Sequence, residues 1–196
     1  MSAIILKDRI TKNYSDEEFL QFCEENRDLR IERNNKLEVI IMSPANSLTG
    51  KINAEITRQL SNWNASHQRG EVFDSSAGFT LPDRSVLSPD AAWMPVAMWN
   101  SLTEQEQWSF APVCPLFIIE VRSKTDTLYD LHKKMNVWIQ SGAQAGWLID
   151  PLNRVTTIYR KDAPEEIIEG FDRKISGNGP VEGFVLDLSF IVKIKR

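Results

Sequence analysis

The feature that most constrains the fold is an apolar run, Leu116–Ile119, that ends in a carboxylate, Glu120, and leads into an amphipathic segment. Four consecutive apolar residues that include two isoleucines are typical of a buried strand. After this run, apolar residues recur at helical spacing, at Leu128, Leu131, Met135 and Trp138. Gly142 follows them and is typical of a helix end. Two more strand-like runs follow at 146–151 and 155–162. We therefore predict an α/β domain with a mixed central β-sheet that helices flank.

Glu120 needs a partner in such a strand. An ionised carboxylate that is buried alone costs several kcal/mol, so it is normally paired with a cation, bound to a metal ion or protonated. Alternation along the strand puts Ile118, Glu120 and Arg122 on one face, where Arg122 is only a diagonal neighbour of Glu120. The partner is therefore expected elsewhere in the chain.

The chain before the apolar run predicts an N-terminal helix and a β-hairpin. Ser15 and Glu18 stand at capping-box spacing ahead of the helix, and residues 29–44 contain two β-rich runs around Asn34 and Asn35. The pattern then predicts an amphipathic helix at 48–67 and two strands around a turn, at 71–82 and 85–95. A connector without periodicity follows at 97–113, and two β-like pieces lie near the end of the chain, at 165–170 and 184–195.

Length and composition limit the classes of protein. The 196 residues fit one domain, 1–196, with a helix and hairpin at 1–45, a core at 48–150 and C-terminal strands at 151–196. A net charge of -4 argues against a protein that coats nucleic acid through general positive charge, but leaves a local basic groove open. Two cysteines and two histidines argue against a disulfide framework and a zinc site. Without a long apolar run, we expect a cytoplasmic protein with no membrane partner.

Asp90 is the second carboxylate of interest, because it begins a strand-like run after Ser-Pro. Antiparallel pairing of this run with the Glu120 strand would bring the two carboxylates together. Two such oxygen donors are what Mg²⁺ or Mn²⁺ prefers, with waters and a phosphate completing the shell. Taken alone, the Ser-Pro-Asp sequence is more typical of a turn.

Helical geometry distinguishes two adjacent lysines. At 100° per residue, Lys133 points away from the apolar stripe of its helix, whereas Lys134 lies on the flank of that stripe. Lys134 is therefore expected to reach past the helix towards the strand ends, unless it pairs with Asp130 one turn earlier.

Together these residues resemble the Uma-two type of endonucleases, part of the PD-(D/E)xK nuclease superfamily. The resemblance rests on "LRIERNNKLEVIIMSP", "GFTLPDRSVLSPDAAWMP" and "CPLFIIEVRSKTDTLYDLHKKMNVWIQSGAQAGWLIDP", and covers most of the chain. It implies a restriction-endonuclease-like core. The positions that match the family's aspartate, glutamate, serine, helical lysine, aromatic and hairpin glutamate are Asp90, Glu120, Ser123, Lys134, Trp138 and Glu32.

The chain departs from the family pattern at three places. The family commonly has an apolar residue where this chain has Arg122, which cannot act as a base but can hold a phosphate. Thr49 stands at about the place of the family's histidine. The family's hairpin glycine is replaced by Asn35 or Lys36.

The resemblance implies a Mg²⁺-dependent or Mn²⁺-dependent endonuclease that acts on DNA. Asp90, Glu120 and the Val121 carbonyl would hold the metal ion, and Lys134 would stabilise the charge of the transition state. Arg122, Ser123 and Glu32 are supporting candidates. The acidic charge, Arg122 and Thr49 favour a second hypothesis, a nuclease-fold protein that binds DNA or protein without catalysis. A structural ion-pair cluster in an unrelated α/β domain is the third.

A homodimer is also expected, because nucleases of this superfamily often cut two strands with two subunits and this chain has one candidate site. Aromatic residues in and near the connector, Trp93, Trp99 and Trp108, are candidate interface anchors, although core packing is the commoner use of such residues.

Overall fold

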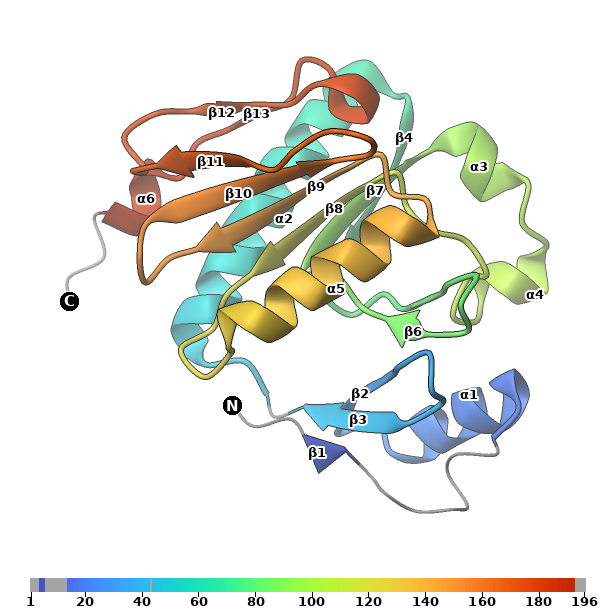
Figure 1. Ribbon diagram of the computed structural model, residues 1–196. Coiled ribbons are helices and arrows are strands. Elements are labelled where there is room, and N and C mark those ends of the chain that lie inside the picture. The colour runs from blue at the N-terminus through green and yellow to red at the C-terminus, as the bar shows by residue number, and fades with distance from the viewer. Residues whose placement is uncertain (1–3, 6–13, 43, 193–196) are drawn as a thin grey trace.

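A mixed sheet lies between two long helices in the computed structural model, which describes residues 4–5, 14–42 and 44–192 (Figure 1). The order of its strands is β11-β10-β9-β8-β7-β4. Among the described strands of this sheet, β8 and β9 pair in parallel and the other neighbours pair antiparallel. The bounds are β4 (Gly70–Asp74), β7 (Ala91–Pro95), β8 (Phe117–Val121), β9 (Ala145–Asp150), β10 (Val155–Arg160) and β11 (Glu166–Glu169). The predicted α/β class with a mixed sheet is confirmed.

Helices α2 (Ser47–His67) and α5 (Leu128–Ser141) cover opposite faces of this sheet (Figure 1). Alternation along β8 places Ile119 in the cluster that contains the apolar stripe of α2, and Ile118 in the cluster that contains the stripe of α5. Helix α5 provides the crossover that parallel neighbours such as β8 and β9 require. Glu120 therefore shares its face of β8 with Ile118, on the side of α5.

The N-terminal elements form a second layer. Ser15 caps helix α1 (Asp16–Glu25), and its capping box with Glu18 is present as predicted. The predicted hairpin is also present, and Leu37 adopts the left-handed conformation in its turn, with a φ of 61°. The hairpin belongs to a smaller sheet of order β1-β3-β2-β6-β5, with bounds β1 (Ile4–Ile5), β2 (Arg30–Arg33), β3 (Val39–Met42), β5 (Phe79–Thr80) and β6 (Val86–Leu87).

The prediction of one strand in each of the runs 71–82 and 85–95 is wrong. Each run breaks into two short strands, because a turn that Asp74 caps interrupts the first run and Pro89, which lacks an N–H donor, interrupts the second. The outer halves, β4 and β7, pair in the large sheet, whereas β5 and β6 pair in the small one. Ser88 and Pro89 consequently join the two sheets.

Two more predictions need correction. The connector 97–113 contains short helices, and the run 184–195 turns into a helix after a two-residue strand, because Asp187 caps the backbone at Ser189. Residues 193–195 of that run lie outside the described residues. The elements concerned are α3 (Val96–Asn100), α4 (Glu104–Gln107), β12 (Ile175–Ser176), a 3-10 turn (Gly179–Val181), β13 (Val185–Leu186) and α6 (Ser189–Val192).

Two of the three aromatic residues that were candidate interface anchors have the commoner use, core packing. Trp93 is buried in the core, and Trp99 packs against the cluster on the α5 side, so both serve packing. Trp108 is 83% exposed and remains the candidate anchor. Among the residues that the structure describes, none of the helices has the length and apolar character of a membrane-spanning segment.

Candidate active site

Asp90 and Glu120 face each other across β7 and β8. The antiparallel register pairs Ala91 with Ile119, and its continuation by one residue puts Asp90 opposite Glu120. The Asp90 N–H donates to the Ile119 carbonyl at 3.0 Å. Both side chains are buried, with residue exposures of 6% for Asp90 and 2% for Glu120. Asp90 thus immediately precedes β7 and lies next to Glu120 on β8, and the two carboxylates are brought together as the sequence predicted.

Two groups from one helix contact Glu120. Trp138 Nε1 donates to Glu120 Oε1 at 2.9 Å, and Lys134 Nζ lies 3.0 Å from the same oxygen. Trp138 and Lys134 stand four residues apart on α5, so both reach the same strand. Burial raises the pKa of Glu120 to about 7; the ammonium of Lys134 opposes this shift, and the charges of Asp90 and Glu32 add to it. Glu120 therefore changes its charge near neutral pH.

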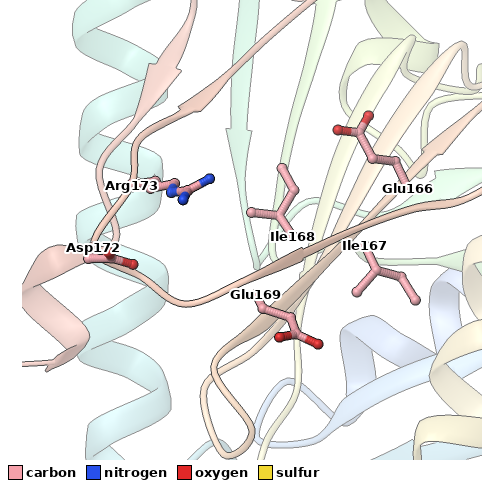
Figure 2. Close-up of a pocket in the computed structure, with 6 residues that line it drawn as sticks. All are labelled: Glu166, Ile167, Ile168, Glu169, Asp172 and Arg173. Atoms are coloured by element: carbon pink, nitrogen blue, oxygen red, sulfur yellow. The ribbon is translucent and has the colours of Figure 1, made fainter.

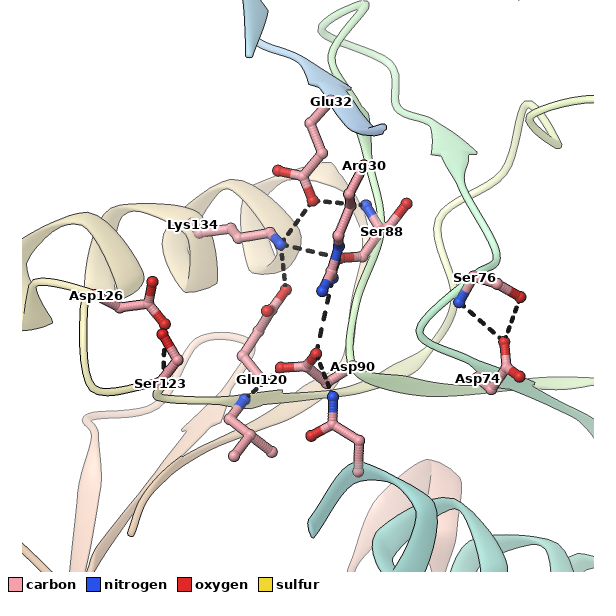
Figure 3. Close-up of polar contacts among 12 residues, drawn as sticks. Arg30, Glu32, Asp74, Ser76, Ser88, Asp90, Glu120, Ser123, Asp126 and Lys134 are labelled. Carbon is pink, nitrogen blue, oxygen red and sulfur yellow. Dashed lines mark hydrogen bonds and ion pairs between the residues drawn. The ribbon is translucent and has the colours of Figure 1, made fainter. Parts of the chain in front are cut away.

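Lys134 connects the large sheet with the small one (Figure 3). Its Nζ donates to Glu32 Oε1 on β2 and to the Ser88 carbonyl, each at 2.9 Å. Burial disfavours the ammonium, but the attraction of Glu120 and Glu32 outweighs it and raises the pKa of Lys134 above its ordinary value. Lys134 is therefore protonated at neutral pH. Lys133, by contrast, is exposed, as helical geometry predicted.

Glu32 fixes the position of Lys134. Its Oε1 accepts from Lys134 Nζ and, at 3.0 Å, from the Ser88 N–H, while the side chain is only 6% exposed. Ser88 in turn presents its carbonyl to Lys134. The hairpin glutamate thus holds both the lysine and the backbone segment that leads to Asp90.

Asp90 is oriented by two donors. The Val121 N–H donates to Oδ2 and Asn53 Nδ2 donates to Oδ1, each at 2.7 Å. Arg30 Nη2 lies farther from Oδ1, at 3.7 Å. Because short bonds fix both oxygens, the carboxylate has one defined orientation.

Three residues of this cluster were missed from the sequence: Arg30, Asn53 and Ser88. Arg30 stands two positions before Glu32 on β2, so alternation alone places the two on one face. Asn53 is a polar residue next to the apolar stripe of α2, and such a buried amide needs a partner. Ser88 acts through its backbone, for which the side-chain pattern carries no signal.

The other candidates lie outside the cluster. Arg122 Nη1 pairs with Asp150 Oδ2 at 2.8 Å, and its Nε donates to the Asp126 carbonyl. The Ser123 N–H donates to Asp126 Oδ2, which closes the turn before α5. Thr49 is buried in the first turn of α2. Arg122 and Ser123 thus shape the loop that joins β8 to α5.

The carboxylates at the centre are of the kind that hard divalent cations bind in proteins. Glu32, Asp90 and Glu120 face the two cations Arg30 and Lys134, so the ionised cluster carries one excess negative charge. Asn53 Oδ1, an acceptor next to Asp90, is buried without a hydrogen-bond partner among the described residues. Among the residues that the structure describes, no group of three or more His, Cys, Asp or Glu side chains is placed so that it could bind one metal ion. Two carboxylates with water ligands are, however, the usual protein contribution to Mg²⁺ binding.

A groove at the edge of the sheet offers a contrasting surface (Figure 2). It is lined by Glu166, Ile167, Ile168, Glu169, Asp172 and Arg173. Strand β11 is three positions from β8 in the sheet order, so the groove is separate from the Asp90 and Glu120 cluster. The lining contains three carboxylates and one arginine, and such an acidic lining repels a phosphate backbone.

Comparisons with known proteins identify a family and a similar fold. The model of the Uma2 family, described as "Putative restriction endonuclease", matches residues 16–189. A similar solved structure, from Anabaena variabilis ATCC 29413, is described as "a putative nuclease belonging to DUF820". It has a TM-score of 0.71 and 17% identity, and the similarity covers 87% of this chain and 96% of that one. At this identity the likeness shows the fold alone. No curated protein is significantly similar in sequence.

The matched range begins with the first residue of α1 and ends with the first residue of α6. It therefore includes β2, β7, β8 and α5, the elements that bring Glu32, Asp90, Glu120 and Lys134 together. Because the family model covers most of the chain, the protein belongs to the Uma2 family of restriction-endonuclease-like proteins.

Proposed function

We propose that the protein is a metal-dependent endonuclease that hydrolyses DNA phosphodiester bonds. The observation that carries this proposal is the convergence of Asp90, Glu120 and Lys134, from two strands and a helix, in one buried cluster. A buried group of two carboxylates and a protonated lysine costs folding free energy, so a functional reason for it is expected.

Asp90 and Glu120, with the Val121 carbonyl, are the residues that would hold Mg²⁺ or Mn²⁺. Such an ion activates a water molecule and stabilises negative charge on the phosphate. The donors to Asp90, which are the Val121 N–H and Asn53 Nδ2, leave the second lone pair of each oxygen available. Trp138 Nε1 and Lys134 Nζ both contact Oε1 of Glu120.

Lys134 would act as an electrostatic group and not as a base. Its pKa is raised above the ordinary value, so it carries a proton at the pH of the reaction. Glu32 and the Ser88 carbonyl hold the ammonium in place before substrate binds, which lowers the reorganisation that charge stabilisation requires. Glu32 is thus a positioning residue for Lys134.

The charge of the cluster supports a phosphodiester substrate. The excess negative charge would become an excess positive charge when a divalent cation binds, and a phosphodiester carries the single negative charge that neutralises it. Family membership points to DNA as the nucleic acid. We further propose a homodimer that would place two such sites on the two strands of a duplex.

The two adjacent lysines provide the test. Lys134→Ala should lower the rate of Mn²⁺-dependent plasmid cleavage by about 100-fold, the usual scale for one preorganised electrostatic group. Lys133→Ala is the matched control, since Lys133 is exposed on the same helix, and it should cleave at nearly the wild-type rate. Thermal melts must show both variants folded.

Equal cleavage by the two variants would remove Lys134 from the mechanism. If the wild-type protein cleaves no double-stranded, single-stranded or branched DNA in Mn²⁺, the hydrolase proposal fails and a binding module without catalysis replaces it.

A further inference from the structure

Arg30 provides the guanidinium of the cluster, and its hydrogen bonding is incomplete. It lies on β2, its side chain is 29% exposed, and it points between Ser88 and Asp90 (Figure 3). Its Nη2 donates to the Ser88 carbonyl at 3.4 Å and lies 3.7 Å from Asp90 Oδ1, so neither contact is short. Its Nε is buried without a hydrogen-bond partner among the described residues. A buried donor without an acceptor is costly, so this arrangement needs an explanation.

Two other arginines show what a satisfied guanidinium looks like in this fold. Arg33, on the same strand, is fully buried and donates to Asp16, to the Ser15 carbonyl and to the Arg84 carbonyl. Arg122 forms a 2.8 Å ion pair with Asp150 and a second bond through Nε. Arg30 alone of these three leaves its planar set of donors largely unused.

The surroundings keep Arg30 charged. Burial disfavours the guanidinium, but the attraction of Asp90, Glu32, Glu120 and Asp126 outweighs it and raises the pKa of Arg30. Arg30 and Lys134 also donate to the same acceptor, the Ser88 carbonyl, so the two cationic heads lie side by side. An anion that reaches this point from solvent would meet both.

We infer that Arg30 binds the non-bridging oxygens of the substrate phosphate, a role that the sequence had suggested for Arg122. The inference rests on the proposed nuclease function and names the residue that receives the phosphate. The planar guanidinium offers two parallel donors that match two phosphate oxygens, whereas an ammonium is a single point charge. The Arg30 side chain is 29% exposed, so a phosphate that approaches this exposed part could replace the long contact between Nη2 and the Ser88 carbonyl with a short one.

The test compares Arg30→Lys with Arg122→Lys, since both keep the net charge and remove only the guanidinium. The probe is thymidine 5′-monophosphate, and its affinity is measured by proton NMR titration without metal and by ³¹P line broadening in the presence of Mn²⁺. Calorimetry gives the Mn²⁺ affinity of each variant. Arg30→Gln provides a second substitution if thermal melts show that Arg30→Lys is unfolded.

Arg30→Lys should lower the affinity for thymidine 5′-monophosphate by about tenfold, which is the scale of one lost charge-assisted hydrogen bond. Arg122→Lys should bind it with the wild-type affinity. Equal affinity of Arg30→Lys and wild type, or a loss confined to Arg122→Lys, would overturn the inference. Failure of the proposed function would give a different result in calorimetry. The wild-type protein would not bind Mn²⁺, or Asp90→Ala would bind it as well as the wild type does. In that case the titration without metal still decides whether Arg30 contacts the phosphate.

Discussion

Replacing Glu120 with glutamine should stabilise the protein, and more so as the pH rises. The folded protein raises the pKa of Glu120 from an ordinary 4.5 to about 7, chiefly because the carboxyl is buried. Folding therefore favours the protonated form. The stability that goes with this proton is fully present below the unfolded pKa and is lost as the pH rises through the folded pKa. Glutamine keeps the acceptor for Trp138 and Lys134 but never ionises.

The size of the effect follows from the two pKa values. A shift of this size corresponds to roughly 3 kcal/mol between the fully protonated and fully ionised limits. About 1 kcal/mol is already lost near pH 5.5, so the wild-type protein should lose about 2 kcal/mol more than Glu120→Gln between about pH 5.5 and about pH 8.5.

Urea unfolding of both proteins across this pH range, with a metal chelator present, measures the difference in the free energy of unfolding. The rest of the sequence is the same in both proteins, so its pH-dependent contributions cancel in the difference. Glu24→Gln is the matched control, because Glu24 is an exposed glutamate on α1, and its difference from wild type should be small and nearly constant. A difference for Glu120→Gln that stays constant or shrinks with rising pH would refute the reasoning.

Two further predictions follow from the site and its family. Asn53→Ala removes one of the two short bonds to Asp90 and should weaken Mn²⁺ binding by about tenfold in calorimetry, whereas Asn62→Ala, an exposed asparagine on the same helix, should not; equal affinities would mean that Asn53 does not orient Asp90. Light scattering at micromolar concentration should report twice the mass of one chain, and Trp108→Ala should shift the protein towards monomer if this 83% exposed side chain is an anchor; a wild-type monomer would contradict the dimer.

Much of the fold could be predicted because local patterns agree with it. The alternation of β8, the stripe of α5 and the capping box of α1 each correspond to the element observed. The division of each run between two sheets could not be predicted by pattern alone, because the turn at residues 75–78 and Pro89 mark breaks but do not say with which strand each half pairs.

Part of the site could also be predicted from the sequence, and part could not. The juxtaposition of Asp90 and Glu120 depends on the antiparallel register of two strands, and the reach of Lys134 depends on its place on one helix, so both were within sequence reasoning. The contacts of Glu32 and Arg30 depend on how the small sheet docks against α5 and β7. That docking is set by tertiary packing, which leaves no periodic signal in the sequence.

The most direct measurement for the proposed metal site is the anomalous scattering of Mn²⁺ soaked into crystals of the protein. The proposal predicts one strong peak within coordination distance, about 2.2 Å, of a carboxylate oxygen of both Asp90 and Glu120. Crystals of Glu120→Gln, soaked in the same way, should lose the peak. A peak that persists in Glu120→Gln, or its absence between Asp90 and Glu120 in the wild-type protein, would contradict the proposed metal-dependent mechanism.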